Sequence, residues 1–206
     1  RRVLFRSVPG TVKGFLYVLE KYGNLDRKAV IQPAIDLANN GYRVSAIMNM
    51  DMKNQINNIL KYPATAKIYL KNGKPYNVGD LLKNPDLAKT MEKIVKDGEK
   101  AFYEGEVAEA IVKATVAAKG KMTLEDLKNY KIKISDPVKG TYRGYEIYTA
   151  APPSSGGAHI IQILNILENY DMKNIPAGSA RYYHLLSESM KMAFADRAKF
   201  MGDTDF

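Results

Sequence analysis

The stretch from Tyr142 to Asn169 constrains the fold more than any other part of the chain. Its first half contains aromatic and β-branched residues that suit a half-buried strand, namely Tyr145, Ile147 and Tyr148. Pro152 and Pro153 must end that strand, because proline has no backbone N–H to donate to a neighbouring strand. The sequence therefore predicts a strand that stops at a sharp turn.

A helix is predicted directly after this turn. Ser154 and Ser155 are good N-cap residues, and Gly156 and Gly157 allow close backbone approach. From His159 onward apolar residues nearly surround the helix: Ile160, Ile161, Ile163, Leu164, Ile166 and Leu167. A helix that is apolar on all sides is expected to be buried.

Helix signals dominate the first 130 residues. Apolar spacing after Pro9-Gly10 predicts a helix that ends at Gly23. Asp26 can cap the next helix, which Pro33 should kink or divide into two short pieces. Further helix starts are predicted at Ser45, Asn84-Pro85-Asp86, Glu106, Thr123 and Ser179, with Asp126 in the place where a capping box has Glu or Gln.

Strand signals are few. Lys67 to Leu70 reads as a short strand followed by a turn at Asn72-Gly73, and Ile132 and Ile134 alternate with lysines. A strand pair around residues 142–148 has its turn at Arg143-Gly144. One or two strand pairs among many helices do not close a sheet, so the predicted class is α+β, mostly helical, and a piece of a larger sandwich.

Composition excludes several kinds of protein. The 206 residues contain no Cys, which rules out disulfides, a thiolate nucleophile and Cys-ligated zinc. No apolar run approaches the roughly 18 residues of a membrane span. The net charge is +9, but the lysines are scattered and stand beside Glu or Asp. We therefore expect a solvated surface and no nucleic-acid partner.

Several motifs in order resemble the γ-glutamyltranspeptidase (glutathione hydrolase) family. Besides PPSSGG and LNILE within residues 142–169, they are Val8–Phe15 (VPGTVKGF), Gln32–Ala38 (QPAIDLA), Pro85–Ala88 (PDLA), Ala101–Gly105 (AFYEG), Met122–Leu127 (MTLEDL), Ala193–Arg197 (AFADR) and Gly202-Asp203. The resemblance covers residues 8–206. Two departures are Ala151, where the family usually has a third proline, and Thr204, where it usually has proline.

The resemblance implies a fragment of the αββα sandwich of N-terminal-nucleophile hydrolases, here an internal segment of the large subunit. It further implies a precursor that cuts itself and frees a threonine, whose hydroxyl attacks the γ-glutamyl amide with its own amine as base. That threonine is expected downstream of Phe206, because no threonine of this chain has the T-[ST]-H-x-S context of the family. We therefore expect no catalytic residue here and no activity of the chain alone.

Substrate and partners also follow from the resemblance. The parent would transfer the γ-glutamyl group of glutathione or related amides to water or amino acids, without a cofactor or metal. Its partner would be the small subunit of the same precursor. The arginine that holds the substrate α-carboxylate is expected upstream of Val8, since Arg43, Arg143, Arg181 and Arg197 do not match its context. Export to the periplasm or the outside is expected from the family.

Residues 1–7 have a separate explanation. They read Arg-Arg-Val-Leu-Phe-Arg-Ser, which is the translation of a common sequencing-adapter oligonucleotide, and the motifs start directly after them. Without these three arginines the net charge falls from +9 to +6. We expect these residues to be a scar, with a genuine basic arm as the alternative, and residues 8–206 to be part of one domain.

The candidate binding residues within the chain are Ser154, Ser155, Gly156 and Gly157. Their backbone N–H groups at a helix start would favour an anion such as the substrate carboxylate. The alternative, which we favour, is that the serines cap the helix and the glycines permit tight packing.

Other polar residues are expected to be structural. His159 and His184 lie in apolar helical patterns and are predicted to be buried and hydrogen-bonded. Glu125 and Asp126 belong at a helix start. Asp203 and Asp205 suggest a cation site with oxygen ligands, or simply a turn.

Two other functions stay open. A related acylase of the glutaryl or cephalosporin type would have the same fold with another acyl group. A self-contained helical interaction module would need helix faces satisfied within these 206 residues.

Overall fold

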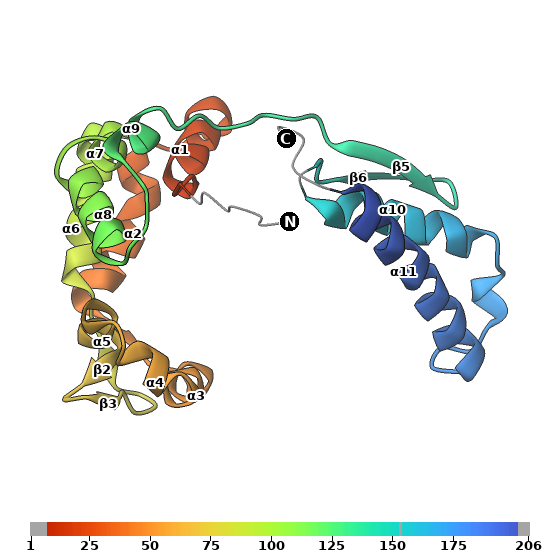
Figure 1. Cartoon of the computed structure of the whole chain (residues 1–206), viewed down its shortest axis with the longest axis horizontal. Coiled ribbons are helices and arrows are strands. Elements are labelled where there is room, and N and C mark those ends of the chain that lie inside the picture. The colour runs from red at the N-terminus through yellow and green to blue at the C-terminus, as the bar shows by residue number, and fades with distance from the viewer. Residues whose placement is uncertain (1–7, 153, 202–206) are drawn as a thin grey trace. The chain divides into compact units, whose positions relative to one another are not determined.

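The computed structural model describes residues 8–152 and 154–201 (Figure 1). The chain divides into two compact units, Arg1–Ile132 and Lys133–Phe206. Among the described residues three separate two-stranded ladders occur, one more than the sequence indicated. The predicted mostly helical character is confirmed.

Unit 1 consists of short helices joined by two small ladders. Its helices are α1 Thr11–Tyr22, α2 Arg27–Asn40, α3 Ala46–Asn54, α4 Ile56–Ile59, α5 Pro63–Tyr69, α6 Pro85–Asp97, α7 Lys100–Tyr103, α8 Gly105–Ala117 and α9 Leu124–Lys128. Its strands are β1 Tyr42–Arg43, β2 Leu70–Lys71, β3 Lys74–Pro75 and β4 Leu81–Leu82. β1 pairs with β4 and β2 with β3, both antiparallel.

Local capping chemistry sets many of these helix ends. The Asp26 carboxylate accepts a hydrogen bond from the Ala29 N–H at 2.7 Å. Thr123 and Asp126 form the predicted capping box, in which each side chain accepts from the other residue's backbone N–H. Ser45 and Asn84 cap α3 and α6 through their side-chain oxygens. These predicted starts are confirmed.

Three apolar clusters hold unit 1 together. The first joins Ile35 and Ala38 of α2 to Ala88 of α6. The second is formed by Val44, Met52 and Leu82 around the β1–β4 ladder. The third is formed by Tyr103, Ala108 and Leu127 of α7, α8 and α9.

Tyr103 fixes the start of α1 to the third cluster. Its side chain is 3% exposed, and its hydroxyl donates to the Pro9 carbonyl oxygen at 2.6 Å and accepts from the Lys13 N–H at 3.2 Å. Its ring stacks on Tyr130, with 5.9 Å between ring centroids. Because burial disfavours the phenolate, the pKa of Tyr103 is raised above its ordinary value.

Three expectations for the backbone are wrong. α2 is one helix with Pro33 inside it and is not divided into two pieces, since its packing on α6 outweighs the cost of a proline, while a kink at Pro33 stays a prediction. Lys67 and the two residues after it belong to α5, which Pro63 starts, and only Leu70 is in a strand. Ile132 and Ile134 lie in irregular chain, where no described strand pairs with them.

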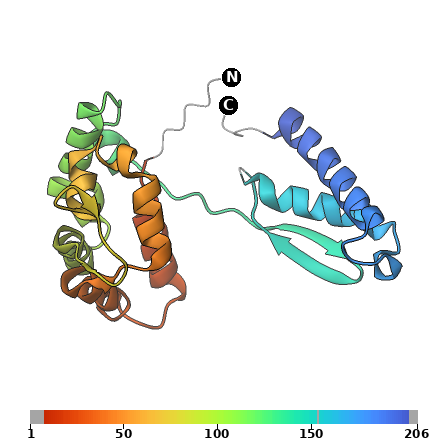
Figure 2. The same ribbon diagram turned by 90° about the horizontal axis from the view of Figure 1, so that it is seen from below.

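Unit 2 is a hairpin with two long helices. Its elements are β5 Val138–Tyr142, β6 Tyr145–Thr149, α10 Ser155–Glu168, the 3-10 helix η1 Met172–Asn174 and α11 Ala180–Phe200. Arg143 and Gly144 both have positive φ, as a two-residue hairpin turn requires. Figure 2 shows α10 between the hairpin and α11.

The hairpin contacts the middle and the C-terminal end of α10. Gly140 of β5 faces Ile161, and a Cβ there would lie 2.6 Å from a methyl group of that side chain. At the hairpin tip the Arg143 N–H donates to the Glu168 carboxylate at 2.5 Å, and its guanidinium donates to the Tyr170 carbonyl oxygen at 3.0 Å.

The expected burial of α10 is only partly found. Gly157, His159 and Leu167 are its buried residues, while Ile160 is half exposed. The hairpin and α11 cover two sides of this helix, and no other described residue of unit 2 covers Ile160.

Replacing Tyr103 by Phe should lower the free energy of unfolding by about 1–2 kcal/mol, because a buried hydroxyl with two backbone partners is lost. The raised pKa of Tyr103 contributes stability that is complete below pH about 10 and is lost as the pH rises through the folded-state pKa. The variant should therefore lose less stability than the wild type between pH 9 and 11, in urea titrations at each pH.

Tyr145→Phe is the matched control, since that side chain is 75% exposed. If Tyr103→Phe and Tyr145→Phe had the same unfolding free energy and the same alkaline profile, the structural role of the Tyr103 hydroxyl would be refuted.

Candidate functional site

The candidate site is the turn between β6 and α10. Ser154 occupies the N-cap position of α10, with φ −66° and ψ 116°, but its side chain makes no capping hydrogen bond. Its backbone N–H donates to the Ala151 carbonyl oxygen at 3.2 Å. The prediction that the serines cap this helix is therefore wrong. Pro153 lies outside the described residues.

Ser155 joins two elements instead of capping one. Its hydroxyl accepts a hydrogen bond from Nε of Arg197, in the last turn of α11, at 2.8 Å. Its carbonyl oxygen is in contact with Nδ1 of His159, whose side chain is buried as predicted. One residue thus connects the first turn of α10 to α11.

The two glycines of the turn have different environments. A Cβ on Gly157 would lie 2.6 Å from Oγ1 of Thr149 and closer still to the Ala150 carbonyl oxygen, so only glycine allows α10 to approach β6 here. Among the described atoms, a Cβ on Gly156 would have only the Ser154 hydroxyl near it, at 3.8 Å. Tight packing is confirmed for Gly157 and not found for Gly156.

The electrostatics of the turn are positive. The first N–H groups of α10 carry the positive end of the helix dipole, and the Arg197 guanidinium lies beside them. About two turns further along α10, Gln162 donates to the Asp196 carboxylate at 2.5 Å. This Asp196 charge adjoins Arg197 in sequence and partly offsets it.

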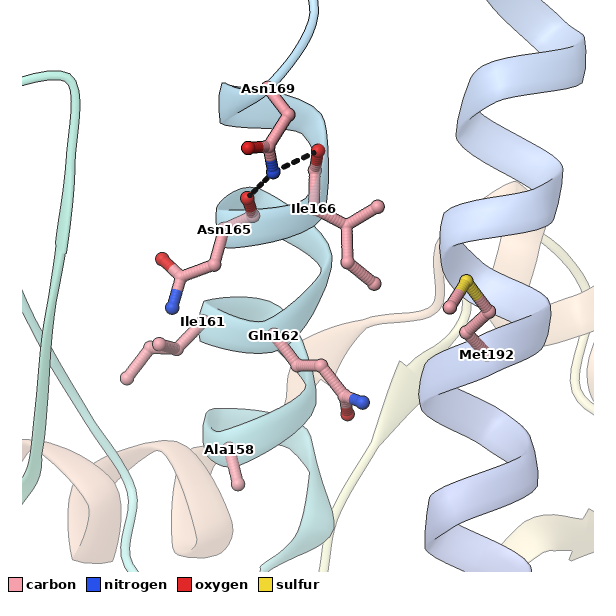
Figure 3. Close-up of a pocket in the computed structure, with 7 residues that line it drawn as sticks. All are labelled: Ala158, Ile161, Gln162, Asn165, Ile166, Asn169 and Met192. Atoms are coloured by element: carbon pink, nitrogen blue, oxygen red, sulfur yellow. Dashed lines mark hydrogen bonds between the residues drawn. The ribbon is translucent and has the colours of Figure 1, made fainter.

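A groove of about 460 Å³ runs along α10 beside α11 (Figure 3). It is lined by Ala158, Ile161, Gln162, Asn165, Ile166 and Asn169 of α10 and by Met192 of α11. The Asn169 carboxamide donates to the Asn165 and Ile166 carbonyl oxygens and so closes the helix end. The lining is carboxamide and apolar, with no titratable group.

A second groove, of about 240 Å³, lies in unit 1. It is lined by Ala34, Leu37, Ala38, Tyr42, Ile68, Tyr69, Leu82, Asn84, Leu87 and Met91. Partial burial raises the pKa of the Tyr42 phenol, and the neighbouring Tyr69 adds to that shift. Neither groove contains a nucleophile with a base beside it.

The other candidate residues do not come together. His184 is exposed on α11, contrary to the expectation that it is buried, because α10 covers the opposite side of that helix at Ser189 and Ala193. Glu125 and Asp126 lie in the first turn of α9, as predicted. Asp203 and Asp205 lie outside the described residues.

Residues 8–152 and 154–201 contain no cluster of three potential metal ligands. None of the helices formed by these residues is long and apolar enough to cross a membrane.

The comparisons with known proteins decide the family. The family model for gamma-glutamyltranspeptidase matches residues 3–206. This chain belongs to the γ-glutamyltranspeptidase family. It is 43% identical over 204 residues to the glutathione hydrolase proenzyme of Escherichia coli (strain K12), covering 98% of this chain and 35% of that protein.

Two further matches are a solved structure with the same fold and a relative that is named as an acylase. The crystal structure of Helicobacter pylori gamma-glutamyltranspeptidase matches with a TM-score of 0.94 and 44% identity, covering 97% of this chain and 57% of the other. An acylase ACY 1 proenzyme of Pseudomonas sp. (strain SE83) is 39% identical, covering 97% of this chain and 36% of that protein. The predicted class, a mostly helical fragment of an N-terminal-nucleophile hydrolase, is confirmed. The chain spans about one third of the length of the curated relatives that it matches.

Sequence reasoning missed the contacts that hold the turn. Arg197 was given no role, yet it reaches Ser155 across 42 positions. Its presence in the AFADR motif, beside Asp196, was the one available signal. Nothing in the local sequence distinguishes Gly157 from Gly156. The difference arises because the turn places Gly157 against the end of β6, at Thr149 and Ala150.

Gly157→Ala should lower the free energy of unfolding by about 2 kcal/mol, because the new methyl group must displace a strand end. Gly156→Ala is the matched control, and it should be neutral or raise that free energy by up to about 1 kcal/mol, since the site is open and alanine favours helix. Urea titration of the two variants checks this pair. Equal values for both would contradict the described packing at Gly157.

Proposed function

We propose that this chain is an internal segment of the large subunit of a precursor that hydrolyses or transfers γ-glutamyl groups. The observation that carries the proposal is the match of the family model over residues 3–206. The 43% identity to a glutathione hydrolase proenzyme over 98% of the chain supports the same assignment.

The chemistry of the parent would reside outside this chain. A threonine freed by self-cleavage, downstream of Phe206, would attack the γ-glutamyl carbonyl carbon with its own amine as base. Backbone N–H groups would stabilise the oxyanion, and water or an amino acid would release the glutamyl group.

The small subunit of the same precursor would be the partner of this segment. The word proenzyme in the names of the relatives supports a processed, two-subunit parent. Ile160 of α10 is half exposed among the described residues, and its apolar side chain would give that subunit a place to pack.

A substrate-binding role for the turn stays a prediction for its four residues, Ser154, Ser155, Gly156 and Gly157. Two of them have structural roles that need no ligand, Ser155 with Arg197 and Gly157 with β6. We therefore propose that the turn holds α10 in place.

The second candidate function is that of an acylase with the same fold. The 39% identity to an acylase ACY 1 proenzyme favours it, and so does the match to a cephalosporin acylase from Bacillus halodurans, with a TM-score of 0.87 and 27% identity. The two functions differ in the acyl group, because a glutaryl group lacks the α-amine of a γ-glutamyl group.

The full-length precursor should release nitroaniline from γ-glutamyl-p-nitroanilide, and the 206-residue chain should release none, because it lacks the expected nucleophile. The matched substrate is glutaryl-p-nitroanilide, on which kcat/KM should be lower by at least about tenfold, since a site built to pair the α-amine is left unsatisfied.

Turnover by the 206-residue chain would refute the proposed absence of a nucleophile. A higher kcat/KM of the precursor on the glutaryl substrate would assign the acylase function instead.

A further inference from the structure

The chain contains two Asn-Gly pairs, Asn40-Gly41 and Asn72-Gly73. In such a pair the glycine nitrogen can attack the side-chain amide of the asparagine, because glycine has no side chain to obstruct the approach. The two pairs have the same chemical groups but different surroundings in unit 1. A difference in their reactivity would therefore come from the fold.

Asn72-Gly73 is the turn between β2 and β3 (Figure 1). Its φ values of 53° and 75° are both positive, as in a two-residue hairpin turn. Both residues are exposed, and a Cβ on Gly73 would meet no described atom within 4 Å. Among the described residues no acceptor is found for the Gly73 N–H, so this nitrogen is open to solvent.

The surroundings of this turn also favour the reactive form of the nitrogen. The Gly73 N–H must lose its proton before the nitrogen attacks, and the exposed Lys71 and Lys74 on either side favour the resulting negative charge. β2 and β3 have only two residues each, and so short a ladder opens at low cost. The turn can therefore reach the geometry that the attack needs.

The surroundings of Asn40-Gly41 oppose the same reaction. Asn40 is the last residue of α2, and the Gly41 N–H donates to the Leu37 carbonyl oxygen at 2.9 Å. The negative end of the helix dipole disfavours an anion at this position. A Cβ on Gly41 would lie 2.7 Å from the Leu81 side chain, so the glycine is also closely packed. Attack here requires the end of α2 to unravel.

We propose that Asn72 is a site of spontaneous covalent modification, at which it becomes aspartate or isoaspartate, and that Asn40 is protected from this change. The deprotonated Gly73 nitrogen attacks Cγ of Asn72, and a new N–Cγ bond forms. The Cγ–Nδ2 bond breaks, and Nδ2 takes up a proton and leaves as ammonia. Water then opens the cyclic imide at either carbonyl carbon, which gives aspartate or isoaspartate. Water is the only co-reactant, so the proposal is independent of the proposed function.

Isoaspartate would also change the hairpin, because it adds one carbon atom to the main chain within the turn. β2 and β3 pair residue by residue, and the length of the turn sets that register. Tyr69 and Tyr76 flank the hairpin and pack on the cluster of Val44, Met52 and Leu82. The modification should therefore loosen this cluster as the protein ages.

The test incubates the 206-residue chain at neutral pH in water labelled with heavy oxygen, once in native buffer and once in guanidinium chloride. Mass spectrometry of the digested chain then measures the label in the peptides that contain Asn72 and Asn40. In guanidinium chloride the two sites should react at similar rates, since neither is protected. In native buffer Asn72 should react at least about ten times faster than Asn40, because only Asn40 must wait for a helix end to open.

Asn72→Asp is the control variant, since aspartate also tolerates positive φ and has no amide to lose. It should remove most of the ammonia that the wild type releases in native buffer. Equal labelling of Asn72 and Asn40 in native buffer would overturn the proposal, and so would ammonia release that Asn72→Asp leaves unchanged. Neither readout uses γ-glutamyl turnover, so a failure here is distinguishable from a failure of the proposed function.

Discussion

The close approach of Gly157 to the end of β6 determines how unit 2 is built. Without a side chain at that position, α10 starts directly against Thr149 and Ala150 and lies along the hairpin. α11 then packs on the other side of α10, and the Ser155–Arg197 and Gln162–Asp196 hydrogen bonds fix its last turns. A larger residue at 157 would move α10, and every one of these contacts depends on its position.

Unit 1 depends on a different principle. Its helices are short, and most are too short to be stable alone in water. Caps at Asp26, Ser45, Asn84 and Thr123 define where they start, and small apolar clusters hold them in place. Tyr103 then joins the start of α1 to these helices through two backbone hydrogen bonds.

The features that the sequence predicted well are those decided by one or two neighbouring residues. Examples are the capping box of α9 and the turns at Asn72-Gly73 and Arg143-Gly144. A cap needs only a side-chain oxygen near the helix start, and a tight turn needs only two residues that adopt positive φ. The failures are decided by distant contacts. Pro33 stays inside α2 because that helix packs on α6 through Ile35 and Ala38. Ile134 forms no strand, and no described strand pairs with it. Within the candidate site the turn was predicted, but the roles of Ser155 and Arg197 were not, because that hydrogen bond joins two different helices.

The central claim is that this segment supports a nucleophile supplied by another part of the same precursor. The most direct measurement is N-terminal sequencing and mass spectrometry of the purified full-length precursor after incubation. We expect two fragments, the smaller of which starts with threonine and comes from the part of the precursor downstream of Phe206. A precursor that stays uncleaved while turning over γ-glutamyl-p-nitroanilide, or a small fragment that starts with a residue other than threonine, would contradict it.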